Sequence, residues 1–96
     1  MIVEREARAE LATAAAWYEE QRPGLGDELL QAVEEALERI VQAPESFPRD
    51  RFDDRARRAS VARFPYGIVF VLHEGEIRVV AFAHVRRLPG HWKGRV

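Results

Sequence analysis

The feature that most restricts the fold is a pair of β-favouring runs in the second half of the chain. Residues 68–72 are apolar at every position, and residues 77–84 form a second run after the short polar segment 73–76. A short run that is apolar throughout is typical of a strand buried on both faces, and a glycine-containing polar segment between two strands predicts a hairpin turn. Residues 55–64 alternate between two faces, which predicts a third strand. We therefore expect an antiparallel three-stranded meander with residues 68–72 at its centre.

The first half of the chain has the apolar periodicity of helices. Apolar side chains recur at steps of three and four over residues 6–21, and again over about residues 26–42. Pro23 and Gly24 end the first helix and Pro44 ends the second, because proline and glycine interrupt a helix. Two helices joined by such a short turn predict an antiparallel αα-hairpin.

The remaining segments complete the expected fold. Residues 1–5 predict a brief edge strand. Residues 43–54 contain two prolines and predict an ordered connector without its own element, anchored to the core by Phe47 and Phe52. We therefore predict one α+β domain over residues 1–96, with a short N-terminal strand and an αα-hairpin packed on an antiparallel sheet of three to four strands.

The composition excludes several classes of protein. The chain has no cysteine, which excludes disulfides and thiolate chemistry and fits a cytoplasmic location. With three histidines and no cysteine we expect no metal site, and we expect no cofactor. We expect no membrane association, because no apolar run approaches the length of a membrane span and the charged N-terminus does not have the pattern of a signal peptide.

The charge is divided unevenly along the chain. The total is −1, but residues 1–48 carry four arginines and eleven acidic residues, a net charge of −7. Residues 49–96 carry eleven lysines and arginines and five acidic residues, a net charge of +6. This asymmetry predicts an acidic back and a basic front. The basic half includes residues 83–95, where a strand end leads into a tail with four cationic side chains, two histidines and a tryptophan, a composition that favours an anion or nucleic-acid site.

Several short motifs, weak singly, form a specific set when taken in order. They are residues 9–11 (AEL), 16–19 (AWYE), 23–26 (PGLG), Ile40 with 43–44 (AP), 63–66 (RFPY), and 84–89 (HVRRLP) with Trp92 and Arg95. With this spacing the chain resembles the RelE/ParE superfamily of toxins from type II toxin–antitoxin systems, and is closest to its ParE and plasmid-stabilisation branch. The resemblance implies the fold predicted above. It also implies a cognate antitoxin, whose C-terminal segment wraps the toxin and silences it.

The resemblance leaves two activities open. ParE-type relatives bind DNA gyrase and poison it without being enzymes, whereas RelE-type relatives cut mRNA on the ribosome. Matched by position, a ribonuclease would use Arg58 and Arg86 as cations, with His84, or alternatively His91, as the titrating group. The RelE groups are absent at three other positions, where this chain has Ser60, Gly67 and Trp92. We therefore expect a non-enzymatic inhibitor, with a ribosome-dependent mRNA endoribonuclease as the alternative.

A non-enzymatic inhibitor needs a surface that binds its target, and basic and aromatic side chains are the usual anchors of such a surface. The expected target-binding residues are Arg63, Tyr66, Arg86, Arg87, His91, Trp92, Lys93 and Arg95. The expected antitoxin-binding residues are Trp17, Tyr18, Leu25 and Leu29. Arg63 is equally suited to an ion pair with Glu10 or Glu19 of the first helix.

Overall fold

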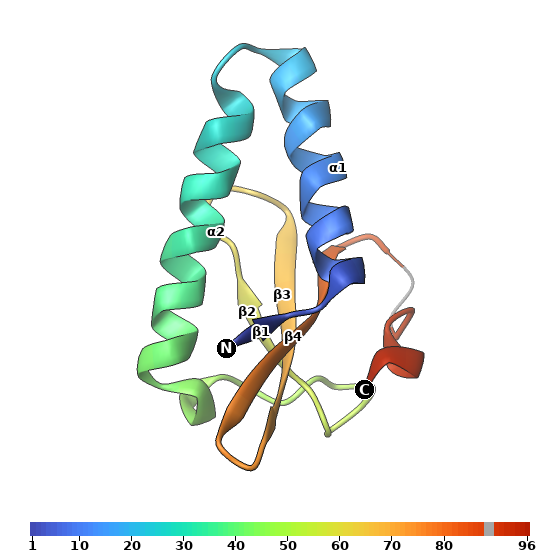
Figure 1. The fold of residues 1–96 in the computed structure, drawn as a ribbon. Helices are drawn as coiled ribbons and strands as arrows, with labels where there is room; N and C mark the ends of the chain where they lie inside the picture. The colour runs from blue at the N-terminus through green and yellow to red at the C-terminus, as the bar shows by residue number, and fades with distance from the viewer. Residues whose placement is uncertain (88–89) are drawn as a thin grey trace.

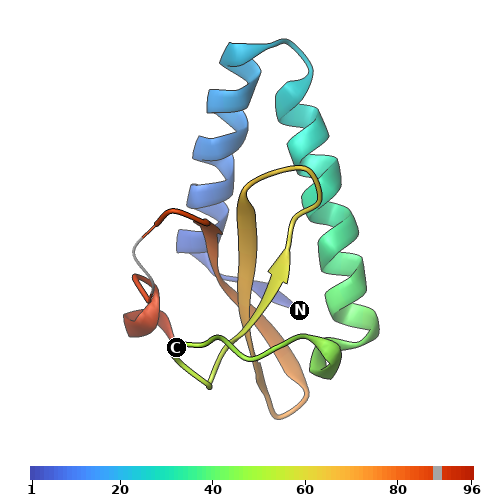
Figure 2. The same ribbon diagram turned by 180° about the vertical axis from the view of Figure 1, so that it is seen from behind.

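The computed structural model describes residues 1–87 and 90–96. Two long helices form a hairpin that covers one face of a four-stranded sheet (Figures 1 and 2). The elements are, in chain order, β1 (Ile2–Val3), α1 (Arg5–Gln21), α2 (Leu25–Gln42), the 3-10 turn η1 (Pro44–Ser46), β2 (Arg57–Ser60), β3 (Tyr66–His73), β4 (Glu76–His84) and the 3-10 turn η2 (Lys93–Arg95). The predicted α+β fold is confirmed.

The sheet has the strand order β1-β4-β3-β2. Strands β2, β3 and β4 are antiparallel neighbours, which confirms the predicted meander. Strand β1 runs parallel to β4, with Ile2 opposite Arg78 and Val3 opposite Val79, so the complete sheet is mixed rather than wholly antiparallel. Because β1 has only two residues, the part of β4 beyond Val79 has no strand on its outer edge.

The αα-hairpin is fixed by Glu19, which lies near the end of α1 and caps the start of α2. Its carboxylate accepts hydrogen bonds from the backbone N–H groups of Gly24 (2.9 Å) and Gly26 (3.0 Å), where a helix N-terminus favours negative charge. Gly26 permits the two helices to approach closely, because a Cβ atom there would lie 2.7 Å from the carbonyl oxygen of Ala15. Both predicted helices are confirmed to within one residue at each end. Within the described residues, neither helix is long and apolar enough to cross a bilayer.

The predicted strand over residues 55–64 is too long, since β2 covers only Arg57–Ser60. The chain turns immediately afterwards, and the N–H of Val61 donates to the carbonyl of Tyr66 across the turn. Arg63 adopts a left-handed conformation there, with φ of 70°. Polar and apolar side chains therefore keep alternating past the end of β2, so the alternation does not show where the strand ends and the turn begins.

The connector is more ordered than predicted. It contains η1 and a single antiparallel bridge between Arg49 and Arg57, so the expectation that it has no element of its own is wrong. Phe47 packs on the core as expected. Phe52 does not, because 51% of its surface is exposed.

The apolar side chains form two cores, one on each face of the sheet. Between β3 and β4 the register shifts, with Val69 opposite Ala81 and Phe70 opposite Val79, so that Val80 is an extra residue on β4. This bulge places Val80 and Ala81 on the same face, because it interrupts the normal alternation. The core on the helix side includes Leu29, Ile40, Ile68, Phe70, Val79 and Phe82. The back core, on the other face, consists of Ala56, Val69, Val71, Val80, Ala81 and Trp92.

Trp92 closes the back core and is only 1% exposed. From the sequence we also considered that Trp92 closes the core by packing over Phe82 or Phe64. Trp92 does close a core, but both phenylalanines belong to the core on the helix side, whereas Trp92 belongs to the back core. Burial also removes Trp92 from the predicted target-binding surface. Its role in the native state is to close the fold.

We expect Trp92→Ala to lower the free energy of unfolding by about 3–5 kcal/mol, because it removes the largest side chain of the back core. The measurement is urea denaturation followed by circular dichroism. Trp17→Ala is the matched control, since Trp17 is 56% exposed and its loss should cost less than about 1 kcal/mol. Equal losses in the two variants would contradict the assigned burial of Trp92.

Candidate functional site

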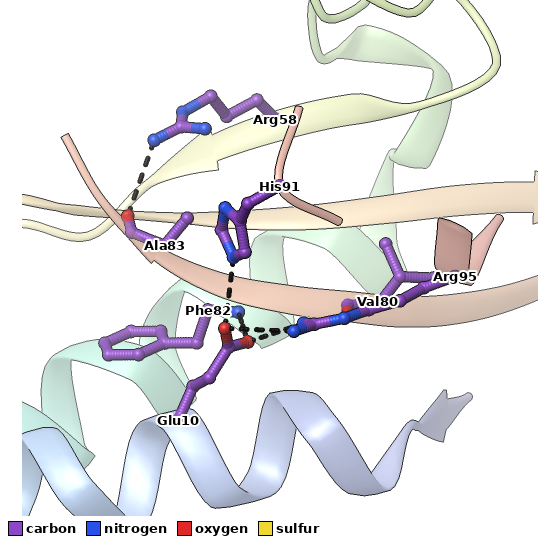
Figure 3. A network of polar contacts seen from close by, with 7 residues as sticks. All are labelled: Glu10, Arg58, Val80, Phe82, Ala83, His91 and Arg95. Atoms are coloured by element: carbon purple, nitrogen blue, oxygen red, sulfur yellow. Dashed lines mark hydrogen bonds and ion pairs between the residues drawn. The ribbon is translucent and has the colours of Figure 1, made fainter. Parts of the chain in front are cut away.

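A polar network joins α1, the edge of β4 and the C-terminal tail (Figure 3). Glu10 lies at its centre. Its Oε1 accepts hydrogen bonds from the N–H of Phe82 (3.1 Å) and from Nη1 of Arg95 (2.8 Å). Its Oε2 lies 3.1 Å from Nε2 of His91, and Nη1 of Arg95 also donates to the carbonyl of Val80 (3.0 Å). We refer to Glu10, His91 and Arg95 as the Glu10 latch.

The latch occupies the part of the β4 edge that β1 leaves unpaired. Strand β1 ends opposite Val79, and beyond it the outward backbone groups of Val80 and Phe82 have no neighbouring strand. Arg95 supplies the donor that the carbonyl of Val80 needs, and Glu10 supplies the acceptor that the N–H of Phe82 needs. Two side chains thus replace the backbone of a pairing strand and satisfy groups that would be costly to leave unpaired.

The environment of Glu10 keeps its carboxylate charged. Burial by itself raises the pKa of Glu10, because desolvation penalises the ionised form. The hydrogen bonds from Arg95, the Phe82 N–H and His91, together with the charge of Arg95, outweigh burial and hold the pKa below its ordinary value of 4.5. The tail is therefore held by charge-assisted hydrogen bonds, which are stronger than neutral ones.

Some of the tail residues that we expected to bind a target have structural contacts instead. The side chains of His91 and Arg95 are only 11% and 22% exposed and both contact Glu10, while Trp92 is buried. The basic surface of the described tail is therefore carried by the exposed residues Arg86, Arg87 and Lys93.

An open groove of about 640 Å³, which we call the front groove, lies between α1 and the adjoining ends of β3 and β4. Trp17 lines the groove beside Tyr18, with their ring centroids 5.0 Å apart. Tyr66 stacks on Phe82, with centroids 4.4 Å apart, and burial raises the pKa of the Tyr66 hydroxyl, with the nearby Tyr18 adding to the effect. Arg87 places a cation on the same groove, and Glu10, whose carboxylate is paired with Arg95, also lines it. The wall is therefore aromatic, with the Arg87 charge available to a ligand.

The residues expected to bind an antitoxin are only partly gathered at the front groove. Trp17 and Tyr18 line it. Leu25 is half-buried at the start of α2 and does not line it. Leu29 is fully buried in the core on the helix side, so its assignment as a contact residue is wrong. The periodicity of α2 placed Leu29 on an apolar stripe but did not distinguish core from surface.

Arg63 was expected to bind a target or to pair with Glu10 or Glu19. Neither pairing occurs, because the latch engages Glu10 and the start of α2 engages Glu19. Arg63 lies on the turn after β2, largely exposed, with its Nη1 3.8 Å from Glu28. A surface pair at that distance leaves the guanidinium accessible to a partner.

The residues assigned to a ribonuclease are not gathered into one site. His84 faces the front groove, and its Nδ1 accepts a hydrogen bond from the N–H of Arg86 (3.0 Å). Arg58 lies across the other face of the sheet, where its Nη2 donates to the carbonyl of Ala83 (3.4 Å) (Figure 3). General acid–base catalysis needs its groups within hydrogen-bond reach of the same reacting atoms. The sheet separates Arg58 from His84.

Two features of the surface were not predicted from the sequence. Glu10 was considered only as a partner for Arg63, although it follows Ala7 by three residues and precedes Ala14 by four, a spacing that places it beside the buried stripe of α1. The second feature is a groove of about 370 Å³, which Arg49 lines together with Arg58 on the sheet face opposite the front groove. The connector that supplies Arg49 has no periodicity from which its position could be predicted.

Comparison with known proteins places the chain in a family. The sequence model of the family described as "ParE toxin of type II toxin-antitoxin system, parDE" matches residues 1–89, a span that includes Leu88 and Pro89, which lie outside the described residues. A chain of the solved structure "Chromosomal ParDE TA system from P. aeruginosa" has the same fold, with a TM-score of 0.72 at 19% identity over 88% of this chain and 95% of that one. No curated protein matches the sequence.

We expect Glu10→Gln to lower the free energy of unfolding at neutral pH by about 1–3 kcal/mol, because it replaces a charged acceptor with a neutral amide. The folded-state pKa of Glu10 is depressed, so its ionisation contributes stability above pH 4.5 that is lost as the pH falls through the folded-state pKa. Urea denaturation of both proteins from neutral pH to below pH 4 should therefore show the difference shrinking in acid.

Glu34→Gln is the matched control for this experiment, because Glu34 is an exposed carboxylate on α2. It should change stability by less than about 0.5 kcal/mol at every pH. A loss in Glu10→Gln that is no larger than in Glu34→Gln would contradict the latch.

Proposed function

We propose that this chain, which belongs to the ParE toxin family of type II toxin–antitoxin systems, inhibits growth by binding DNA gyrase as a non-enzymatic inhibitor and is neutralised by a cognate antitoxin. Membership of a toxin–antitoxin family implies an antitoxin partner. The choice of gyrase rests on the resemblance to the ParE branch. We further propose that the toxin acts in the cytoplasm.

The observation that carries the non-enzymatic form of the proposal is the separation of Arg58 from His84. The first lies on the face of the sheet away from the helices and the second faces the front groove, so one substrate phosphate does not meet both. His84 is also engaged, because its Nδ1 accepts the N–H of Arg86. A ribosome-dependent endoribonuclease, which needs cation and base at one phosphate, is the less favoured activity.

The target surface that we propose is the exposed basic segment after β4. Arg86 and Arg87 are both exposed, and the latch fixes the tail that follows them. Among the described residues, no carboxylate forms an ion pair with either arginine. Exposed cations at a strand end that no carboxylate neutralises are suited to an acidic partner surface. Arg63, Tyr66 and Lys93 are proposed as further contacts.

The antitoxin site that we propose is the front groove. It combines the exposed ring of Trp17 with Tyr18, and an aromatic, open groove is a typical site for an amphipathic peptide segment. Arg87 at the groove offers a charge to an acidic side chain of that segment. An antitoxin seated there would cover Arg87, one of the proposed target contacts, which gives a direct way to neutralise the toxin.

We expect the purified chain to inhibit DNA supercoiling by gyrase, and an Arg86→Ala/Arg87→Ala double variant to need roughly tenfold more protein for the same inhibition. Arg5→Ala/Arg8→Ala is the matched control, since both arginines are exposed on α1, and it should inhibit like the wild type. If the wild type leaves supercoiling intact and cuts mRNA in a translating extract, the ribonuclease activity replaces the proposal.

We expect Trp17→Ala to weaken binding of the cognate antitoxin by roughly thirtyfold, because an exposed tryptophan at the rim of a groove is a typical hot spot worth about 2 kcal/mol. Isothermal titration calorimetry with the purified antitoxin measures the change. Val41→Ala is the control, since Val41 is 54% exposed on α2 and does not line the front groove. An unchanged affinity for Trp17→Ala would place the antitoxin elsewhere.

A further inference from the structure

We propose that the groove on the sheet face away from the helices binds an acidic peptide segment of a partner protein, with a carboxylate on Arg58 and an apolar side chain beside Phe52 and Val85. We call it the arginine groove. It has a volume of about 370 Å³, and its walls include Arg49, Arg51, Phe52, Arg58, Ala83 and Val85. Residues 48–52 of the connector before β2 form one side, and Val85 with residues 90–92 form the other.

Arg58 is the side chain from which the inference starts. It is half-buried on β2, and the one hydrogen bond that its guanidinium makes within the described residues is the 3.4 Å contact from Nη2 to the carbonyl of Ala83. No carboxylate within those residues forms an ion pair with it. A guanidinium has five N–H donors and stays charged at all accessible pH values, so four donors and a full charge remain for a ligand.

Gly67 fixes where the Arg58 guanidinium lies. Arg58 lies opposite Val69 and Gly67 lies opposite Ser60, so the two residues are diagonal neighbours on β2 and β3, and a Cβ atom on Gly67 would lie 2.5 Å from Nε of Arg58. The absence of a side chain at position 67 therefore lets the guanidinium lie along the sheet. A planar group held against a flat surface presents its N–H edge in a fixed direction, which is the geometry that favours bidentate binding of a carboxylate.

The rest of the groove is also positively charged. Arg49 donates from Nη1 to the carbonyl of Asp54 (2.9 Å), a contact that leaves its charge unneutralised. The guanidinium of Arg51 lies 5.6 Å from the ring centroid of Phe52. Asp50 is the one acidic residue among the described lining residues, and its Oδ2 already accepts the N–H groups of Phe52 (2.8 Å) and Asp53 (3.1 Å). Three arginines thus face one engaged carboxylate, which favours a negatively charged occupant.

The apolar part of the groove favours a peptide over a nucleic acid. Phe52 and Val85 are 51% and 60% exposed, and Pro48 and Ala83 add further apolar surface between the arginines. A single-stranded nucleic acid is usually held by several stacking aromatic rings along a continuous basic track. One exposed aromatic ring and one exposed aliphatic side chain instead match an acidic segment that carries an apolar anchor.

The arginine groove is separate from the front groove, because the sheet lies between them and none of the residues that the structure describes lines both. Its occupant therefore does not compete for the proposed antitoxin site. The proposed binding of an acidic peptide is also independent of the gyrase proposal, because it does not require gyrase to be the partner.

The test uses the full chain and a fluorescein-labelled probe, a short blocked peptide of alternating glutamate and phenylalanine residues. Fluorescence anisotropy should detect binding, and Arg58→Gln should weaken it about tenfold, because the principal charged contact is lost. Phe52→Ala should weaken it about threefold and tests the site through an exposed residue whose loss does not threaten the fold. Arg5→Gln, an exposed arginine on α1, should leave binding unchanged.

A lysine–phenylalanine peptide and a single-stranded oligothymidine serve as competing probes. We expect neither to bind as tightly as the acidic peptide. The inference is overturned if the acidic peptide does not bind, if Arg58→Gln and Phe52→Ala both bind it like the wild type, or if the oligothymidine binds more tightly and loses affinity in Arg58→Gln. Supercoiling measured on the same variants reports on gyrase independently.

Discussion

The structure depends on one carboxylate, Glu10, that connects three parts of the chain. Strand β1 is too short to cover the outer edge of β4, so the backbone of Val80 and Phe82 must find partners elsewhere. Glu10 from α1 and Arg95 from the tail provide them, and they also neutralise each other. This arrangement holds the tail in place and so keeps Trp92 over the back core. Apart from the latch, the tail is attached to β4 by a hydrogen bond from Arg78 Nη2 to the carbonyl of Arg95 (3.4 Å) and by the packing of Trp92.

Because of this arrangement, several basic and aromatic residues of the tail stabilise the fold instead of binding a ligand. The composition of residues 83–95 predicts an anion-binding segment. In the structure, however, His91 and Arg95 bind Glu10, and Trp92 is buried in the back core. The positive charge that remains exposed is carried by Arg86, Arg87 and Lys93. The sheet then separates two grooves of different character, an aromatic front groove against α1 and an arginine groove on the other face. The two proposals therefore assign the antitoxin and the acidic peptide to separate surfaces of the fold.

Local periodicity was sufficient to predict the helices, the meander and the β3–β4 hairpin, because these elements are set by spacing within a few residues. It failed where contacts join distant positions. Glu10 and Arg95 are 85 residues apart in sequence, and no local pattern indicates that they meet. The all-apolar run of residues 68–72 predicted a strand buried on both faces, but the bulge at Val80 breaks the alternation of β4, and the packing of Trp92 on the back core could not be predicted from spacing. The ordered set of family motifs supplied the fold and family but not the position of either groove.

The central claim is that an ionised Glu10, held by Arg95, attaches the tail to the rest of the fold. Carbon-13 NMR titration of the Glu10 carboxyl group tests it most directly. The account predicts a pKa below 4.5 in the wild type and a higher pKa in Arg95→Gln, because burial still raises the pKa while the strongest opposing contact is gone. A Glu10 that titrates at its ordinary value in both proteins would contradict the latch and the structural role assigned to the tail.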